Sequence, residues 1–344
     1  MKRTALIFTC LLAVFVVYAQ TVKTVSNHSL GGAQYSNILD AYNAANANDT
    51  LLFEGTTAVY STTALGAIDK PLVMIGQGIN TQKQQFQPTM LGLTTNDNND
   101  WRFQFSPGSS GSKIYGMTFT GYTLIAASGL TFENCKFDWL VRVAGNNNIF
   151  KNCIFNNSQN VNLISGTVNN ILFAGCIFNH NLTGTGSVQY VTVDHCLFLA
   201  SDGCFSNCNG FEVKNSIFMN TTGVSGITGS TFQSNLVRIS STFPPAGNTD
   251  AGGNLVGSDP MFVAFTAGQL YATSHDYHLQ AGSPAIGAGS DATDIGLHGG
   301  LTHFSEAGEP LVAPVVRSMH ISNTTIPPGG TLHVQITASK PDSD

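Results

Sequence analysis

The stretch VTVDHCLFLASDG, residues 191–203, places an aspartate, a histidine and a cysteine at consecutive positions, Asp194, His195 and Cys196. A second aspartate, Asp202, follows eight residues after Asp194. These residue types could form a metal site, a cysteine nucleophile with a histidine base, or a carboxylate site for a cation. Which of these chemistries is possible depends on whether the triplet occurs once or is one copy of a repeat.

Aligning the chain on its cysteines reveals seven related hexapeptides, which begin 18, 18, 23, 20, 20 and 19 residues apart. They are IYGMTF (114–119), FENCKF (132–137), FKNCIF (150–155), FAGCIF (173–178), VDHCLF (193–198), VKNSIF (213–218) and FQSNLV (232–237). The first, fourth and last columns are mostly small or apolar, which predicts that they point inward. The second column is mixed and predicts an outward direction. The third column is rich in Gly and Asn, which tolerate left-handed backbone angles and predict a turn.

A period near 20 residues, built of strands and turns without a helical pattern, predicts a β-solenoid. Each coil would lie on the previous one at a spacing of ~4.8 Å, so that like residues stack on like. The repeated pattern of asparagine, cysteine and phenylalanine resembles that of secreted bacterial proteins of the pectin-lyase-like superfamily, which form a right-handed parallel β-helix. The resemblance covers roughly residues 22–300 and implies an all-β fold.

The two ends of the chain agree with this fold. The segment 36–55, SNILDAYNAANANDTLLFEG, predicts a short capping helix with Ser36 as N-cap, followed by a strand. The segments 257–262 and 276–296 resemble closing coils of the solenoid. After residue 300, alternating strands around the turn at 327–330 predict a C-terminal strand pair packed on the solenoid end, or a stub that led into another domain.

The first residues predict export, because Lys2 and Arg3 precede an apolar run and a small-residue cleavage point at Ala19. The expected division is therefore a signal peptide (1–19), the β-helix (20–300) and a C-terminal β tail or stub (301–344). No other stretch reaches the ~18 apolar residues of a membrane span. We expect a monomer that is secreted, periplasmic or on the cell surface.

The charge of the chain argues against nucleic acid as a partner. The formal net charge is −6, and without Lys2 and Arg3 it is −8, from 12 basic and 20 acidic residues. A chain of this sign has no basic footprint for nucleic acid. Only 10% of the residues are charged, against an average of ~25%. Such a composition is typical of secreted all-β proteins.

Within the repeat, the opening triplet has a purely architectural explanation. Cys196 belongs to the inward column, His195 to the turn column, and Asp194 to the outward column, where it would face Lys214 one coil later. Cysteines stacked in register aim their side chains in the same direction, so we expect the stack to consist of free thiols. Cys204 and Cys208, in a predicted loop, are better candidates for a disulfide.

The same stretch also resembles a pectate lyase signature, in which an Asp-His strand is followed by D-G-x-x-D. Asp194 and His195 match the first part, and Asp202 with Gly203 matches the second, which implies calcium bound by Asp194 and Asp202. Two departures weaken the match. Ser206 replaces the last aspartate, and the segment 221–230, TTGVSGITGS, lacks the arginine that is the usual base of that family.

Other residues could bind and process a sugar polymer. Lys214 and Lys151 are candidates for the base of a β-elimination. Trp139, Arg142 and Tyr190 are candidates for substrate binding, through aromatic platforms and a cation for acidic sugars. The sequence therefore predicts an exported carbohydrate-active β-helix, a polysaccharide lyase-like enzyme on acidic glycans such as pectin. The alternative is a non-catalytic glycan-binding or cell-surface structural solenoid.

Overall fold

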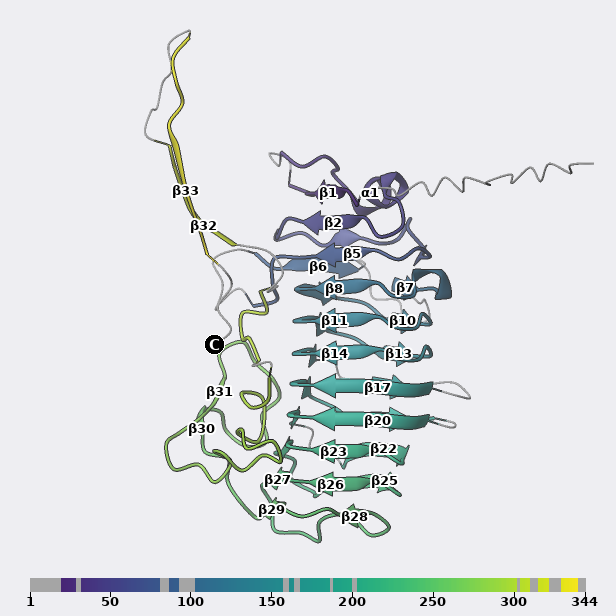
Figure 1. Cartoon of the computed structure of the whole chain (residues 1–344), viewed down its shortest axis with the longest axis vertical. Helices are drawn as coiled ribbons and strands as arrows, with labels where there is room; N and C mark the ends of the chain where they lie inside the picture. Colours follow the sequence, from purple (N-terminus) through teal and green to yellow (C-terminus); the bar gives the residue numbers. More distant parts are fainter. Residues whose placement is uncertain are drawn as a thin grey trace, which may run out of the picture.

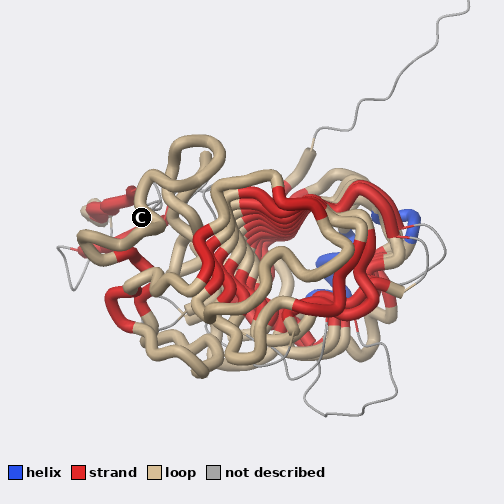
Figure 2. The backbone as a smooth tube through the Cα atoms, turned by 90° about the horizontal axis from the view of Figure 1, so that it is seen from below, coloured by secondary structure: helices blue, strands red, loops and turns tan. Residues whose placement is uncertain are grey.

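The computed structural model shows strands stacked coil upon coil into a right-handed parallel β-helix (Figure 1). Seen along the solenoid axis, three sheets surround one continuous interior (Figure 2). No helix among the described residues is long and apolar enough to cross a membrane. The structure describes residues 20–28, 32–80, 87–92, 103–156, 161–163, 168–185, 188–199, 203–301, 304–309, 315–321 and 329–339.

Each full coil contributes one strand to each of the three parallel sheets, here called sheets A, B and C. Sheet A contains 11 strands: β1 (Val22–Val25), β2 (Thr50–Phe53), β5 (Val73–Ile75), β8 (Lys113–Tyr115), β11 (Thr131–Glu133), β14 (Ile149–Lys151), β17 (Val168–Ala174), β20 (Val188–Asp194), β23 (Glu212–Lys214), β26 (Thr231–Gln233) and β28 (Thr249–Asp250). Sheet B contains 10 strands: β3 (Tyr60–Ser61), β6 (Thr89–Gly92), β9 (Met117–Phe119), β12 (Lys136–Phe137), β15 (Ile154–Phe155), β18 (Ile177–Phe178), β21 (Leu197–Phe198), β24 (Ile217–Phe218), β27 (Leu236–Val237) and β29 (Leu255–Val256). Sheet C contains eight strands: β4 (Ala67–Ile68), β7 (Phe103–Phe105), β10 (Thr123–Ile125), β13 (Val141–Val143), β16 (Val161–Leu163), β19 (Leu182–Gly184), β22 (Cys204–Asn209) and β25 (Ser225–Thr228).

The predicted phenylalanine stack is confirmed. Strands of successive coils pair in parallel and in register, so that Phe178 lies beside Phe155 on one side and Phe198 on the other. From Phe119 to Phe218, neighbouring rings of this file have centroids 4.7–5.3 Å apart and planes within 15° of parallel. A coil alone cannot bury these rings, so the stack itself forms the core.

The turn column is confirmed by its backbone angles. Asn134, Asn152, His195 and Asn215 have φ values of 54°, 50°, 50° and 51°, and glycines occupy the same position in other coils. This left-handed conformation costs least for Gly and Asn, which explains the composition of the column. It turns the chain from sheet A into sheet B in each coil.

The six cysteines that the structure describes are buried free thiols. Cys176 N donates to Cys196 Sγ at 3.4 Å, and Cys196 N donates to Ser216 Oγ at 3.0 Å, so the column also accepts backbone hydrogen bonds between coils. The expectation of a disulfide between Cys204 and Cys208 in a loop is wrong. Both lie in strand β22, where Cys208 Sγ donates to the Leu182 carbonyl at 3.2 Å.

The N-terminal capping helix is confirmed as α1 (Ile38–Ala44), with Ile38, Ala41 and Tyr42 buried. Its N-cap is Asn37 rather than the predicted Ser36. The Asn37 side chain accepts a hydrogen bond from Asp40 N at 2.9 Å, which satisfies one of the free amides of the first turn. A 3-10 turn, η1 (Pro107–Ser109), lies between sheets C and A in a later coil.

The expected closing coils differ from the structure. After β29, residues 258–301 and 304–309 run back along the outside of sheet B, where they form the antiparallel pair β30 (Phe262–Ala264) and β31 (Asp276–Leu279) (Figure 1). Their apolar side chains meet the outward row of sheet B and create a second core. That row consists of Ile154, Ile177, Leu197, Ile217 and Leu236. Strands β15, β18, β21, β24 and β27 of sheet B are therefore buried on both faces, which explains why both residues of each are apolar.

The C-terminal strand pair is present as β32 (Val315–Ile321) and β33 (Val334–Ser339), which pair antiparallel, but it does not pack on the solenoid end as expected (Figure 1). This ribbon points away from the solenoid (Figure 1), and residues 334–338 are exposed. The division of the chain at residues 19 and 300 stays a prediction, although the last solenoid strand is already β29.

Replacing one ring in the middle of the phenylalanine file tests the stacked core. For Phe178→Ala we expect a loss of about 3–5 kcal/mol in the free energy of unfolding, because the cavity cannot collapse between two fixed coils. The measurement is urea denaturation followed by circular dichroism. The control is Gln189→Ala, at an exposed position of β20, which should change stability by about 0.5 kcal/mol or less. Equal losses in the two variants would contradict a continuous core.

Candidate functional site

The structure distributes the predicted site residues over two faces of the solenoid. Lys151, Asp194 and Lys214 share one outward column of sheet A. Tyr190 lies earlier in β20 of the same sheet and is 73% exposed. Arg142 is the outward residue of β13 in sheet C, and Trp139 lies in the connection that precedes β13. Asp202 lies outside the described residues.

The two predicted bases are not neighbours. Lys151 pairs with Ala174, Ala174 with Asp194, and Asp194 with Lys214, so the two lysines are three coils or about 14 Å apart. The predicted pairing of Asp194 with Lys214 is replaced by other contacts. Lys214 Nζ lies 3.2 Å from Glu212 Oε1 on its own strand.

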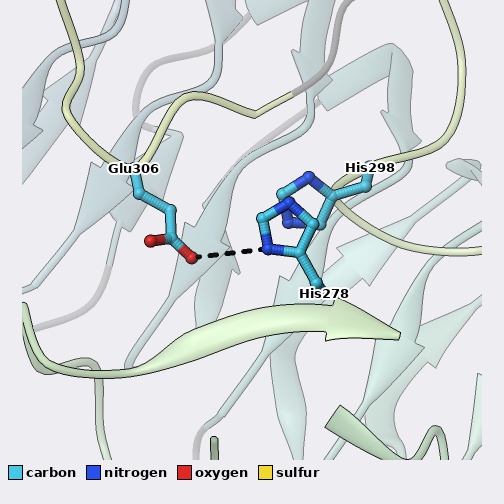
Figure 3. A group of neighbouring side chains, drawn as sticks. All are labelled: His278, His298 and Glu306. Atoms are coloured by element: carbon cyan, nitrogen blue, oxygen red, sulfur yellow. Dashed lines mark ion pairs between the residues drawn. The ribbon is translucent and has the colours of Figure 1, made fainter. Parts of the chain in front are cut away.

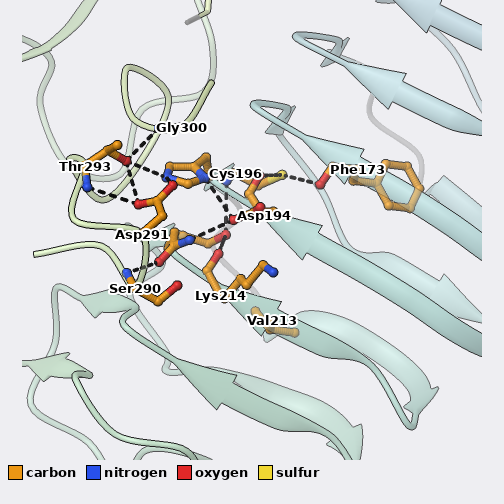
Figure 4. A network of polar contacts seen from close by, with 12 residues as sticks. Phe173, Asp194, Cys196, Val213, Lys214, Ser290, Asp291, Thr293 and Gly300 are labelled. Carbon is orange, nitrogen blue, oxygen red and sulfur yellow. Dashed lines mark hydrogen bonds and ion pairs between the residues drawn. The ribbon is translucent and has the colours of Figure 1, made fainter. Parts of the chain in front are cut away.

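Asp194 and His195 of the opening triplet take part in a partly buried polar network instead (Figure 4). His195 Nδ1 lies 2.8 Å from Asp194 Oδ1, and His195 Nε2 lies 3.2 Å from Thr293 Oγ1 and 3.6 Å from Asp291 Oδ2. The His195 side chain is only 7% exposed. Both nitrogens of the imidazole therefore contact groups of the chain, which fixes the orientation of the ring.

Residues 290–300 join this network from the C-terminal segment. Asn215 Nδ2 donates to Asp194 Oδ1 at 2.9 Å, while Asn215 Oδ1 accepts from Ser290 N at 2.7 Å. The Asn215 carbonyl accepts from Gly296 N at 2.8 Å. A β-carbon on Gly300 would lie 3.2 Å from the His195 ring, so glycine allows this loop to pack on the imidazole. The network thus attaches the C-terminal segment to two adjacent turns of the solenoid.

Cys196 does not form a nucleophile with His195. Its thiol points into the core, is fully buried, and donates to the Phe173 carbonyl at 3.5 Å (Figure 4). Burial, together with the neighbouring Cys176 thiol, holds the pKa of Cys196 well above its usual range. A thiol that stays protonated is a poor nucleophile and a poor metal ligand.

Asp194 is also a poor start for a calcium site. Its Oδ1 already contacts His195 Nδ1 and Asn215 Nδ2, whereas calcium takes about six to eight oxygen ligands. The groups around this carboxylate oxygen are nitrogens, which do not supply the oxygen ligands that calcium needs. The calcium role of Asp194 with Asp202 stays a prediction, and the contacts of Asp194 do not favour it.

The outer face of sheet C offers a different site. In successive coils its outward row contains Gln104, Leu124, Arg142, Asn162, Thr183 and Ser206. All are partly exposed except the buried Thr183, and the row extends roughly 24 Å along the axis. Arg142 is the one charged residue of the row.

An aromatic pair lies at the edge of this face. The Trp139 ring, before β13, lies 5.8 Å from the Tyr122 ring, before β10, at an angle of 32°. Both residues are partly exposed. The sequence predicted Trp139 and Arg142 as binding residues but not Tyr122. Tyr122 could have been identified because it lies one coil before Trp139, at a similar place in the repeat. The structure therefore groups two of the predicted binding residues, while the third, Tyr190, lies on sheet A.

Comparison with solved structures supports the fold. A rhamnogalacturonan lyase matches with a TM-score of 0.50 and 13% identity, over 76% of this chain and 97% of that chain. Pectate lyase Pel9A matches with a TM-score of 0.51 and 15% identity, over 82% of this chain and 96% of that chain. No protein-family model and no curated protein matches the chain. At this identity the likeness shows the fold alone, a parallel β-helix.

The His195 network should give Asp291 a contribution to stability that is lost as the pH falls into the acidic range. Burial acts to raise the pKa of Asp291, but hydrogen bonds from Thr293 and the neighbouring His195 outweigh it, so the pKa lies below its ordinary 3.8. A lowered pKa in the folded state stabilises the protein above the unfolded pKa and loses this contribution as pH falls through the folded pKa.

We therefore expect Asp291→Asn to be less stable than the parent protein at pH 6, with the difference shrinking below about pH 4. Urea unfolding of both proteins between pH 6 and pH 3 measures this difference. A difference that stays constant over the whole range would contradict the proposed ionic role of Asp291.

Proposed function

We propose that this pectin-lyase-like β-helix is an exported carbohydrate-active protein that holds an acidic polysaccharide along the outer face of sheet C. The observation that carries the proposal is the position of Arg142 in a long row of polar and apolar residues, next to the aromatic pair of Trp139 and Tyr122. The likeness of the fold to two lyases of sugar polymers supports a carbohydrate as the ligand.

The chemistry of these residues suits a uronate chain. The planar guanidinium of Arg142 can donate two parallel hydrogen bonds to one carboxylate, which a lysine cannot reproduce. The aromatic pair presents large apolar rings that can pack on the faces of sugar rings with little loss of side-chain entropy. Amide and hydroxyl side chains of the same row, from Gln104 to Ser206, supply further hydrogen bonds.

A catalytic function on the same glycan is the second candidate. The two structural neighbours are lyases, which favours β-elimination, with Lys214 or Lys151 as the base and Asp194 and Asp202 on the metal side. However, both lysines lie on sheet A, whereas Arg142 lies on sheet C. A glycan held at Arg142 would not face them, so binding has more support than lysine-dependent elimination. If the protein binds the glycan without cleaving it, it is a glycan-binding module or a cell-surface structural solenoid.

Binding to polygalacturonate tests the sheet C face. We expect Arg142→Ala to weaken binding about 10- to 100-fold, because a hydrogen-bonded charge pair is lost. Trp139→Ala should also weaken it, and Arg142→Lys should restore only part of the affinity. Calorimetry or affinity electrophoresis measures the change. The matched control is Lys113→Ala, which removes an exposed cation from sheet A. Equal affinity of Arg142→Ala and the parent protein would reject this face.

The reaction is tested separately on a panel of uronate polymers, with and without calcium, by following the ultraviolet absorbance of unsaturated products. A product signal that disappears in Lys214→Ala or Lys151→Ala would support elimination with a lysine base. Binding without any product across the panel would identify a binding module. Unchanged turnover in Asp194→Ala would remove the proposed metal role of Asp194.

A further inference from the structure

Two histidines and a glutamate meet in the C-terminal segment, away from both faces discussed above (Figure 3). His278 belongs to β31, while His298 and Glu306 lie on the stretch that passes beside this strand. One ligand atom from each residue lies within 4.8 Å of the other two. His278 Nδ1 is 3.9 Å from Glu306 Oε1, and the two imidazole rings are stacked with centroids 3.8 Å apart.

Burial and charge at this cluster favour a cation. The Glu306 side chain is only 8% exposed, while that of His278 is 42% exposed, so the cluster has a buried base and an accessible side. A fourth group, Asp276, places Oδ1 2.8 Å from His278 Nδ1. The two carboxylates place negative charge beside the imidazoles, which favours a divalent cation.

We propose that His278, His298 and Glu306 form a binding site for a transition-metal ion of the Zn²⁺ type. Two imidazoles and one carboxylate are donors that zinc prefers, and three protein ligands leave a fourth position for water on the accessible side. Calcium and magnesium favour oxygen donors and would gain little from the imidazoles.

Asp276 holds Nδ1 of His278, so His278 would bind the ion through Nε2 and Asp276 would act as a positioning residue. Its carboxylate also accepts a hydrogen bond from His278 N at 3.0 Å, so it is fixed next to the ring that it contacts. A carboxylate that holds a ligating imidazole orients the ring and strengthens its donor nitrogen. Loss of such a partner weakens metal binding without removing a ligand.

The ion would secure the segment that covers sheet B. The stretch 304–309 reaches the solenoid through Ile79 N, which donates to the Ala307 carbonyl at 3.1 Å, and through Asn134 Nδ2, which donates to the Glu309 carbonyl at 2.8 Å. A metal bound by His278 and Glu306 would link this stretch to β31. Metal binding should therefore stabilise the second core as well as the site.

The test uses the untagged full chain after removal of metals with a chelator. We expect calorimetry to show one Zn²⁺ bound per chain, Co²⁺ to give the visible absorption of a tetrahedral nitrogen and oxygen site, and the melting temperature to rise with Zn²⁺. His278→Gln and Glu306→Gln should each weaken Zn²⁺ binding by at least about 100-fold, and Asp276→Asn by about 10- to 100-fold.

His180→Gln is the control, since it removes a partly exposed imidazole outside the cluster. It should bind Zn²⁺ like the parent protein. Circular dichroism of each metal-free variant checks that the solenoid is folded, and Glu306→Gln preserves the shape of the buried side chain. No stoichiometric Zn²⁺ binding, Zn²⁺ binding that survives both ligand substitutions, or a preference for Ca²⁺ would each overturn the proposal.

Discussion

In-register parallel pairing of successive coils is the constraint on which the rest of this structure depends. A residue at one position of a strand must lie directly over its counterpart in the previous coil, at a distance set by backbone hydrogen bonds. Each column can therefore hold only residues that tolerate a copy of themselves as a neighbour. Phenylalanine rings stack with nearly parallel planes, small thiols fit one above another, and Asn or Gly satisfies the repeated left-handed turn.

The same constraint organises the surface into rows instead of converging clusters. On the outward face of sheet A, for example, Lys214 lies beside Glu212 of the same strand. A linear ligand suits such a surface, because the polar row of sheet C repeats at the spacing of the strands. Converging groups arise where the C-terminal segment crosses the solenoid, at His195 and at the cluster of His278, His298 and Glu306.

The sequence predicts the solenoid well because its information is local and periodic. Inward columns, turn positions and the capping helix depend on residues within one or two coils. The course of residues 258–309 could not be predicted in this way, since it depends on contacts far apart in the chain. Thr293 meets His195 across 98 positions, and Tyr271 N meets Asn179 Oδ1 across 92. The sequence nevertheless indicates that the outer face of sheet B is buried. The outward positions of its strands carry apolar residues, which need another part of the chain packed on them: Ile154, Ile177, Leu197 and Ile217.

The central claim, that stability arises from contacts between adjacent coils, is tested most directly by double-mutant cycles within the phenylalanine file. The interaction energy between Phe155 and Phe178, whose ring centroids are 4.9 Å apart, should be about 0.5–1.5 kcal/mol in urea unfolding. The pair Phe155 and Phe218, with two rings between them, should show an interaction energy near zero. Equal interaction energies for the adjacent and the distant pair would contradict the account.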